Sequence, residues 1–200
     1  MRANIYADPV NYTLNEIDLD AKWHIGLEHG AYFAYQNKIP LTVALGDFDS
    51  LEEAKRQTLE EAKIPFETYP ARKDDTDTAL AVKYAMRLGA KEIVVYGGLG
   101  ERLDHTYANL LLCKMAPVSF INASTKMYAL SKGVHVLKDV YPIVSFFALE
   151  PVVGLTLKGF DYALENHVLT PEDPLCISNH GQGTVSFEAG IVLVIESKET

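Results

Sequence analysis

The chain has few cysteines and no long apolar segment, and each shortage excludes a class of protein. Its two cysteines, Cys113 and Cys176, lie in apolar runs without metal-ligand spacing, so we expect buried free thiols. No apolar run reaches the length of about 18 residues that a membrane helix needs. The opening residues, Met1-Arg2-Ala3-Asn4, are not those of a signal peptide. We therefore expect a cytoplasmic protein without a membrane partner.

Positive charge is also scarce. The chain has 18 Lys and Arg against 27 Asp and Glu, which gives a formal net charge of -9. This balance argues against non-specific nucleic-acid binding, although an acidic protein can still bind phosphates through a local metal site. Its 200 residues, 48% apolar and 22% charged, suit one large globular domain or two small ones.

The first half of the chain alternates short apolar runs with helical patterns. We expect helices over 31–38, 51–63, 76–88 and 106–115, and a turn at 28–30 before the first of them. We expect strands over 2–6, 23–27, 41–45, 65–70, 91–96 and 118–122. Strands and helices in this rhythm predict a parallel sheet covered by helices. The polar stretch 7–22 fits neither pattern.

From about residue 125, strand candidates follow one another without helices. Turn residues separate most of them, as at Ser131-Lys132-Gly133 and Glu188-Ala189-Gly190. The candidates cover 126–130, 134–138, 143–149, 153–157, 175–178, 184–188 and 191–195. This cadence predicts an antiparallel sandwich or barrel-like domain. We therefore expect two domains: residues 1–124, which are α/β with a mostly parallel sheet, and residues 125–200, which are antiparallel β.

Two acids stand where the strand 41–45 passes into the helix 51–63. Asp47 and Asp49 belong to the segment Gly46-Asp47-Phe48-Asp49-Ser50. Open α/β sheets bind ligands at the carboxyl ends of their strands. Two Asp one residue apart can turn their oxygens to one Mg²⁺. The alternative is that Asp49 and Ser50 cap the helix while Asp47 is solvated.

A second acidic cluster precedes the helix 76–88. It comprises Asp74, Asp75 and Asp77. Acids at a helix start can serve only as a cap and complement the helix dipole. Three of them in four residues exceed that need and repel one another unless a cation lies among them. Since both clusters follow predicted strand ends, a shared Mg²⁺ is the simplest explanation.

A glycine-rich segment, Gly97 to His105, leads into the helix 106–115. Glycines let backbone N–H groups approach an anion, and Arg102 offers a planar fork that suits phosphate. The segment has neither the Walker A pattern nor the spacing of a dinucleotide fingerprint. The alternatives are a plain loop, Asp104 as a cap and His105 as a polar residue at a helix start.

The segments just described, taken in order, resemble the thiamine pyrophosphokinase family. The resemblance runs from about residue 23 to the C-terminus. Its motifs are Gly46–Ser50, Lys73–Thr78, Gly98–Thr106 with Asn109, Ser145–Leu149, Gly154–Gly159, Leu164–His167 and Ser178-Asn179. By its residue types alone, Ser178-Asn179 is only a turn. The family departs from this chain at Glu28, Glu101 and His180, and its glycine-rich opening is absent from 5–10.

The resemblance implies an N-terminal α/β domain, a C-terminal antiparallel β-sandwich, and a homodimer with active sites at the subunit interface. It implies transfer of pyrophosphate from ATP to the hydroxyethyl oxygen of thiamine, with AMP released. The domain 1–124 would then bind ATP and Mg²⁺, and the domain 125–200 would bind thiamine and form the dimer.

The resemblance also assigns roles to residues. It places Mg²⁺ on Asp47, Asp49, Asp74 and Asp77. It makes Asp47, Asp49, Asp77, Arg102 and Asp104 the catalytic set. It gives nucleotide contacts to Gly30, Gly46, Ser50, Thr76, Arg102 and His105. It gives thiamine contacts to Asp104, Ser178 and Asn179.

Two other functions fit part of the pattern. A nucleotide-sugar glycosyltransferase also uses Asp-x-Asp with a divalent metal, but it explains neither the second acidic cluster nor the late β-domain. A thiamine or nucleotide sensor that has lost catalysis is the non-enzymatic alternative, against which the acids at 47, 49, 74 and 77 argue.

Overall fold

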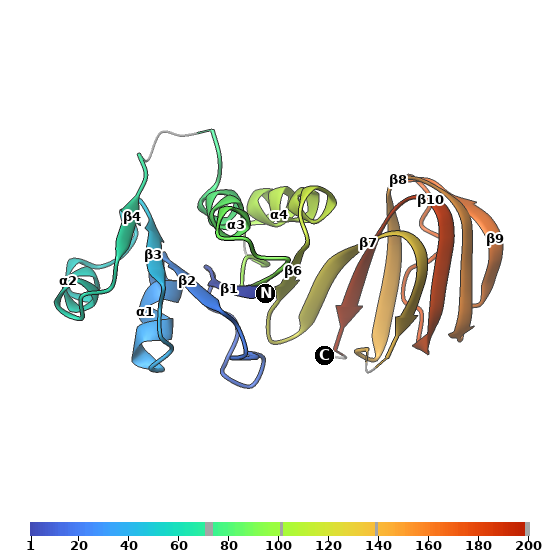
Figure 1. Ribbon diagram of the computed structural model, residues 1–200. Coiled ribbons are helices and arrows are strands. Elements are labelled where there is room, and N and C mark those ends of the chain that lie inside the picture. The colour runs from blue at the N-terminus through green and yellow to red at the C-terminus, as the bar shows by residue number, and fades with distance from the viewer. Residues whose placement is uncertain (71–73, 101, 139, 199–200) are drawn as a thin grey trace. The chain divides into compact units, whose positions relative to one another are not determined.

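The computed structural model describes residues 1–70, 74–100, 102–138 and 140–198, and the chain divides into two compact units (Figure 1). The first unit is Met1–Ala123 and the second is Ser124–Thr200. The described residues form ten strands of mixed direction, parallel within the first unit and antiparallel within the second. In the described part of the chain, no helix is long and apolar enough to cross a membrane.

The first unit is built on a parallel sheet with the strand order β4-β3-β2-β1-β5-β6. The strands are β1 Arg2–Tyr6, β2 Trp23–Leu27, β3 Val43–Gly46, β4 Phe66–Thr68, β5 Glu92–Tyr96 and β6 Val118–Ile121. The central strands are buried along almost their whole length, which explains their continuous apolar runs.

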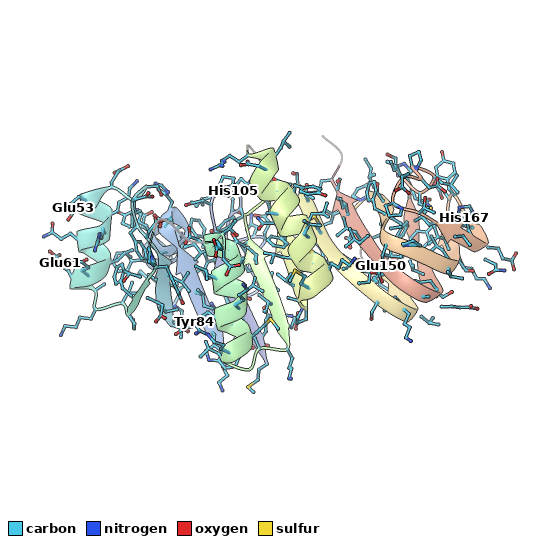
Figure 2. The ribbon with its side chains drawn as sticks, turned by 90° about the horizontal axis from the view of Figure 1, so that it is seen from above. Glu53, Glu61, Tyr84, His105, Glu150 and His167 are labelled. Atoms are coloured by element: carbon cyan, nitrogen blue, oxygen red, sulfur yellow. The ribbon has the colours of Figure 1, made fainter. Side chains whose placement is uncertain are left out.

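The helices described beside this sheet are α1 Glu28–Gln36, α2 Glu53–Glu61, α3 Asp77–Arg87 and α4 Leu103–Met115. Each helix follows a parallel strand in the chain, so its N-terminus lies toward the carboxyl end of that strand. Only Leu59 of α2 is fully buried, and Figure 2 shows Glu53 and Glu61 on the side of α2 turned away from the sheet. The helix starts are therefore the parts of these elements that position a site.

In the second unit, the described strands are antiparallel and lie in the order β7-β10-β8-β9. They are β7 Thr125–Leu137, β8 Ile143–Phe160, β9 Leu164–Leu169 and β10 Gly181–Ser197. Their buried side chains, among them Phe146, Leu155 and Val185, form one apolar cluster. This unit thus has its own core.

Several strands predicted in this unit are parts of longer ones, because long strands bend where the sequence pattern predicts turns. The candidates 126–130 and 134–138 form one strand, as do 184–188 and 191–195. The pairing register shifts between Phe187 and Ile191, and Gly190 has a φ of 98°. Such a bulge kinks a strand without reversing it.

Two further differences concern strand identity. The predicted strand 175–178 is not one, although an isolated bridge joins Asn179 to Val144 beside it. The strand β9 was not predicted, because Glu165, Asn166 and His167 give it no apolar alternation. Both segments lie at the edge of the apolar cluster, where periodicity carries little information.

Candidate functional site

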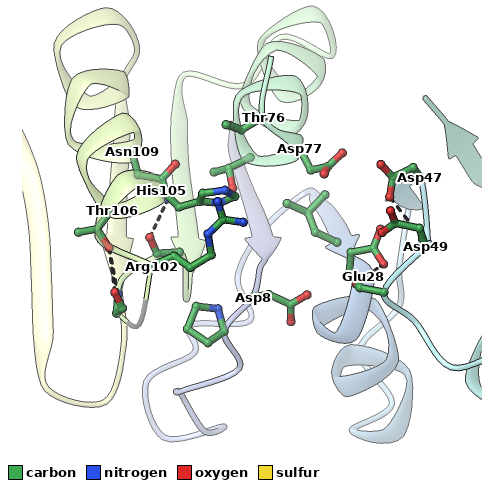
Figure 3. Close-up of a pocket in the computed structure, with 16 residues that line it drawn as sticks. Asp8, Glu28, Asp47, Asp49, Thr76, Asp77, Arg102, His105, Thr106 and Asn109 are labelled. Carbon is green, nitrogen blue, oxygen red and sulfur yellow. Dashed lines mark hydrogen bonds between the residues drawn. The ribbon is translucent and has the colours of Figure 1, made fainter. Parts of the chain in front are cut away.

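The first unit contains a cavity of about 390 Å³ beside the carboxyl ends of its strands (Figure 3). Its lining comprises Asp8, Pro9, Leu27, Glu28, Asp47, Asp49, Ser50, Thr76, Asp77, Thr78, Gly98, Gly100, Arg102, His105, Thr106 and Asn109. In Figure 3, Glu28, Asp47 and Asp49 lie on one side and Arg102 and His105 on the other, with Asp8 and Asp77 between them. Acidic groups thus face a basic group across one cavity.

Glu28 is the first residue of α1, so the predicted turn at 28–30 is instead the first turn of this helix. Its side chain is buried, and its carboxylate accepts hydrogen bonds from the Phe48 amide at 2.7 Å and from Ser50 Oγ at 3.0 Å. Burial raises the pKa of Glu28, and the nearby negative charges of Asp47 and Asp77 raise it further. The acids therefore act on one another electrostatically, as carboxylates converging on a cation site do.

The loop after β3 presents Asp47 and Asp49 to the cavity. Between them, Phe48 is buried and packs edge-on against Phe66, with ring centroids 4.9 Å apart. The alternative that Asp49 and Ser50 cap α2 is wrong: the cap residue is Glu52, without a side-chain bond, because α2 begins only at Glu53. Ser50 instead donates to Glu28.

The second acidic cluster is divided by the start of α3. Thr76 is the cap, and its Oγ1 accepts a hydrogen bond from the Ala79 amide at 3.1 Å. Thr76 and Asp77 line the cavity, whereas Asp75 pairs with Lys83 at 2.7 Å. Because the helix starts at Asp77, Asp74 lies before it; Asp74 is exposed and is not among the cavity residues.

The glycine-rich segment forms the opposite wall. The helix α4 begins at Leu103, three residues earlier than predicted. The Gly100 amide donates to Thr106 Oγ1 at 3.1 Å, and Asn109 Nδ2 donates to the Gly98 carbonyl at 2.7 Å. These two bonds hold the glycine segment against α4. The bonded residues of α4, Thr106 and Asn109, line the cavity.

Arg102 and Asp104 form an exposed pair beside this wall. Arg102 Nη2 lies 2.6 Å from Asp104 Oδ2. The hydrogen bond from Arg102 lowers the pKa of Asp104. Arg102 and His105 line the cavity, while Asp104 is not among its lining residues. The guanidinium is thus available at the cavity with its charge partly matched by a neighbouring carboxylate.

Asp8 is a cavity residue that sequence analysis missed. It is the second residue after β1. Its Oδ2 accepts a hydrogen bond from the His29 amide at 3.3 Å and lies 3.3 Å from His29 Nδ1. Burial raises the pKa of Asp8. Its position just after a parallel strand could have indicated a site residue. No recognisable motif in the polar stretch 7–22 supported that assignment.

Two predicted nucleotide residues, Gly30 and Gly46, are not among the lining residues and have packing roles. A Cβ on Gly30 would lie 2.2 Å from the Tyr6 carbonyl oxygen. A Cβ on Gly46, which has a φ of 150°, would lie 2.6 Å from Glu28 Oε1. Gly30 thus lets α1 come close to the end of β1, and Gly46 leaves room for the Glu28 carboxylate beside the acidic loop.

The acids of the cavity fit a magnesium ion that also binds phosphate. Asp47, Asp49 and Asp77 supply the hard oxygen donors that Mg²⁺ prefers. Among the residues that the structure describes, no three His, Cys, Asp or Glu side chains are grouped closely enough to hold a metal by themselves. Mg²⁺ is commonly held by one or two carboxylates together with substrate phosphates, and this donor set matches that arrangement.

Ser178 and Asn179 lie in the second unit. Asn179 is 1% exposed; its Oδ1 accepts from the Tyr162 amide at 2.9 Å and its Nδ2 donates to the Tyr162 carbonyl at 2.9 Å. It lines a second cavity of about 420 Å³ together with Tyr162 and Leu175. The Ser178 amide donates to Ser145 Oγ at 3.0 Å. Lys73 and Glu101, which belong to the quoted motifs, lie outside the described residues.

Comparisons with known proteins cover nearly the whole chain. Residues 14–128 match the family model described as thiamin pyrophosphokinase, catalytic domain, and residues 133–192 match its vitamin B1 binding domain. The chain is 32% identical to the thiamine pyrophosphokinase of Bacillus subtilis over 98% of this chain and 94% of that protein.

Solved structures agree with these matches. A crystal structure of thiamine pyrophosphokinase from Bacillus subtilis superposes with a TM-score of 0.86 at 29% identity, covering all of both chains. One of thiamin pyrophosphokinase from Geobacillus thermodenitrificans gives 0.84 at 28%, covering 100% of this chain and 99% of that one. The chain therefore belongs to the thiamin pyrophosphokinase family.

Proposed function

We propose that this chain transfers a diphosphoryl group from ATP to thiamine and releases AMP. The observation that carries the proposal is the cavity in which Asp47, Asp49 and Asp77 face Arg102 and a glycine-rich helix start. Such a site can receive a polyphosphate, since the acids suit its metal ion and the guanidinium suits its oxygens. Membership of the family supports thiamine as the acceptor.

The chemistry is an in-line substitution at the β-phosphorus of ATP. The hydroxyethyl oxygen of thiamine forms the new bond, and the bond from the β-phosphorus to the oxygen bridging the α- and β-phosphates breaks. AMP leaves with that oxygen, and the hydroxyl proton passes to solvent or a neighbouring carboxylate. The protein contributes positioning and stabilisation of developing charge, as in phosphoryl transfer generally.

We assign the metal to the carboxylates of Asp47, Asp49 and Asp77. Asp74 is the fourth ligand that the resemblance implies, but it does not line the cavity. When bound, Mg²⁺ supplies positive charge to the phosphate oxygens. Arg102 binds phosphate oxygens from the opposite wall through its forked N–H groups. Thr76 and Ser50 border the same space, and His105 supplies a further polar group for the nucleotide.

Asp104 is assigned to orienting thiamine. The pair with Arg102 lowers its pKa, which makes it a weaker base and keeps it ionised at neutral pH. An ionised carboxylate attracts the cationic thiazolium ring of thiamine. This electrostatic role suits Asp104 better than removal of the hydroxyl proton does.

The second unit is assigned to thiamine binding and to dimerisation, with a β-sandwich as its proposed architecture. Asn179 is the last residue of Ser178-Asn179 and lines a cavity there.

The helix α4 of the first unit carries an exposed apolar residue at every fourth position: Leu103, Tyr107, Leu111 and Met115. An apolar stripe of this kind supports a homodimer in which this helix of the first unit also contributes contacts. The free, buried cysteines support a cytoplasmic location.

Product analysis tests the proposal. Purified protein is incubated with thiamine, ATP and Mg²⁺, and the products are separated by chromatography. Equal amounts of AMP and thiamine diphosphate are expected. Thiamine and ATP that bind but are not consumed would indicate a sensor, and turnover of a nucleotide sugar instead would indicate a glycosyltransferase. Either result would overturn the proposal.

A further inference from the structure

The carboxylate of Glu28 connects two elements at the cavity. It projects from the first residue of α1 to the loop that carries Asp47 and Asp49. Oε1 accepts the Phe48 amide at 2.7 Å, and Oε2 accepts the Ser50 hydroxyl at 3.0 Å. Glu28 is only 7% exposed, so water competes little for these bonds. One side chain thus ties a helix start to the peptide unit between the two acids.

That peptide unit has an unfavourable backbone conformation. Phe48 has a φ of 58° and Glu28 a φ of 45°, values that side-chain-bearing residues adopt rarely. Such conformations persist where surrounding contacts over-determine them. For Phe48, those contacts are its packing against Phe66 and the bond from its amide to Glu28. Rotation about Phe48 would redirect the carboxylates on both sides of it.

We propose that Glu28 is a positioning residue, which directs Asp47 and Asp49 into the cavity through its bonds to Phe48 and Ser50. The inference rests on the proposed function, since it assigns those two acids to the metal. Each oxygen of Glu28 accepts a bond from the loop, so we assign it a role through these hydrogen bonds. Direct ligation of the metal is the alternative that the experiment below distinguishes. Side chains that hold metal-binding carboxylates in place commonly matter to metal affinity.

Side-chain length and charge can be separated at this position. Glu28→Gln keeps the length: its amide oxygen can accept from Phe48, and its NH₂ group can donate to Ser50 Oγ. Glu28→Asp keeps the charge but is one methylene shorter, so it cannot make both bonds unless α1 moves. Positioning depends on length, whereas direct metal ligation depends on charge.

The experiment measures two properties of each variant. Steady-state kinetics give kcat, the KM values and the Mg²⁺ concentration for half-maximal rate. Mn²⁺ binding in the presence of a non-hydrolysable ATP analogue, followed by electron paramagnetic resonance, gives metal affinity without turnover. The variants are Glu28→Gln, Glu28→Asp, Asp47→Asn and, as a control, Glu53→Asp, which shortens an exposed Glu in the first turn of α2.

We expect Glu28→Asp to weaken Mn²⁺ binding by about 10- to 100-fold, as loss of other outer-shell partners does. The kcat should fall in parallel, while the KM for thiamine changes little. Glu28→Gln should restore most of the affinity and rate, and Glu53→Asp should match the wild type. A Glu28→Gln variant as impaired as Asp47→Asn would overturn the proposal, as would a Glu28→Asp variant that binds Mn²⁺ normally.

A second variant covers the case in which Glu28→Asp fails to fold. Ser50→Ala removes one of the two bonds and leaves Glu28 intact. We expect it to weaken Mn²⁺ binding while the protein stays folded, with a Tm lowered by the loss of one bond to a buried carboxylate. Unchanged binding would contradict the proposal. Failure of the proposed function gives a different result. The wild type would then make no AMP, while the Mn²⁺ affinities of the variants would still differ as expected and would support the positioning role.

Discussion

Asp47 and Asp49 concentrate the proposed metal chemistry in two side chains. Both line the cavity, and neither belongs to the apolar core. Asp47→Asn or Asp49→Asn should therefore reduce kcat by about 100-fold or more, which is about 3 kcal/mol of transition-state stabilisation. The Tm should stay close to that of the wild type. Near-normal kcat at saturating Mg²⁺ in either variant would remove it from the metal site.

Arg102 offers a second test at the scale of single residues. Its guanidinium borders the cavity and pairs with Asp104 through two nitrogens, at 3.3 and 2.6 Å. Lys cannot copy this forked geometry. Arg102→Lys should therefore lower kcat/KM for ATP by about tenfold or more, on the scale of charge-assisted bonds to phosphate. Unchanged kinetics would mean that Arg102 serves only its pair with Asp104.

The sequence predicted some of these residues better than others. Asp47, Asp49 and Arg102 lie in motifs beside strand ends, and strand ends can be located from periodicity. Asp8 lacked such a motif, and the contacts of Glu28 depend on a chain segment about twenty residues away. The fully bonded amide of Asn179 could not be foreseen either, since its partner Tyr162 is distant in sequence.

At the scale of elements, the start of α3 separates a structural role from a chemical one. Both Thr76 and Asp77 line the cavity, but the side chain of Thr76 caps the helix, whereas Asp77 is assigned to the metal. Thr76→Ala should lower the free energy of unfolding by about 1 kcal/mol, the usual value of a lost cap. Asp77→Asn should lower kcat sharply with little change in Tm. Melting curves and initial rates on both variants check this, and a fully active Asp77→Asn would assign Asp77 to the helix dipole alone.

Element types were more predictable than their limits. The helices and strands of the first unit follow apolar periodicity, and most of their limits agree with it to within a few residues. In the second unit, Gly133 and Gly190 suggest turns, but they lie inside long bent strands. A turn and a bulge use the same residue types, so only pairing with neighbouring strands distinguishes them.

At the scale of the whole molecule, buried thiols make the folded state less stable as the pH becomes alkaline. Burial raises the pKa of Cys113 to about 12, whereas an unfolded thiol has a pKa of about 8.5. Above that unfolded value, only the unfolded state releases the proton, so stability falls as pH rises toward the native pKa. The contribution of one such thiol is about 1.4 kcal/mol per pH unit.

Cys113→Ala should therefore flatten the loss of unfolding free energy between about pH 8.5 and 11. It should lower stability at neutral pH as well, because the side chain is buried. Denaturant titrations of both proteins across this range measure the two slopes. Parallel slopes would show that Cys113 ionises equally in the folded and unfolded states.

The central claim is that the bond cleaved lies between the α- and β-phosphates of ATP. The most direct measurement uses ATP labelled with ³²P at the β-phosphate, incubated with the protein, thiamine and Mg²⁺. The account predicts that the label appears in thiamine diphosphate and that the AMP is unlabelled. Labelled ADP together with thiamine monophosphate would show transfer of the γ-phosphate alone, and it would contradict the account.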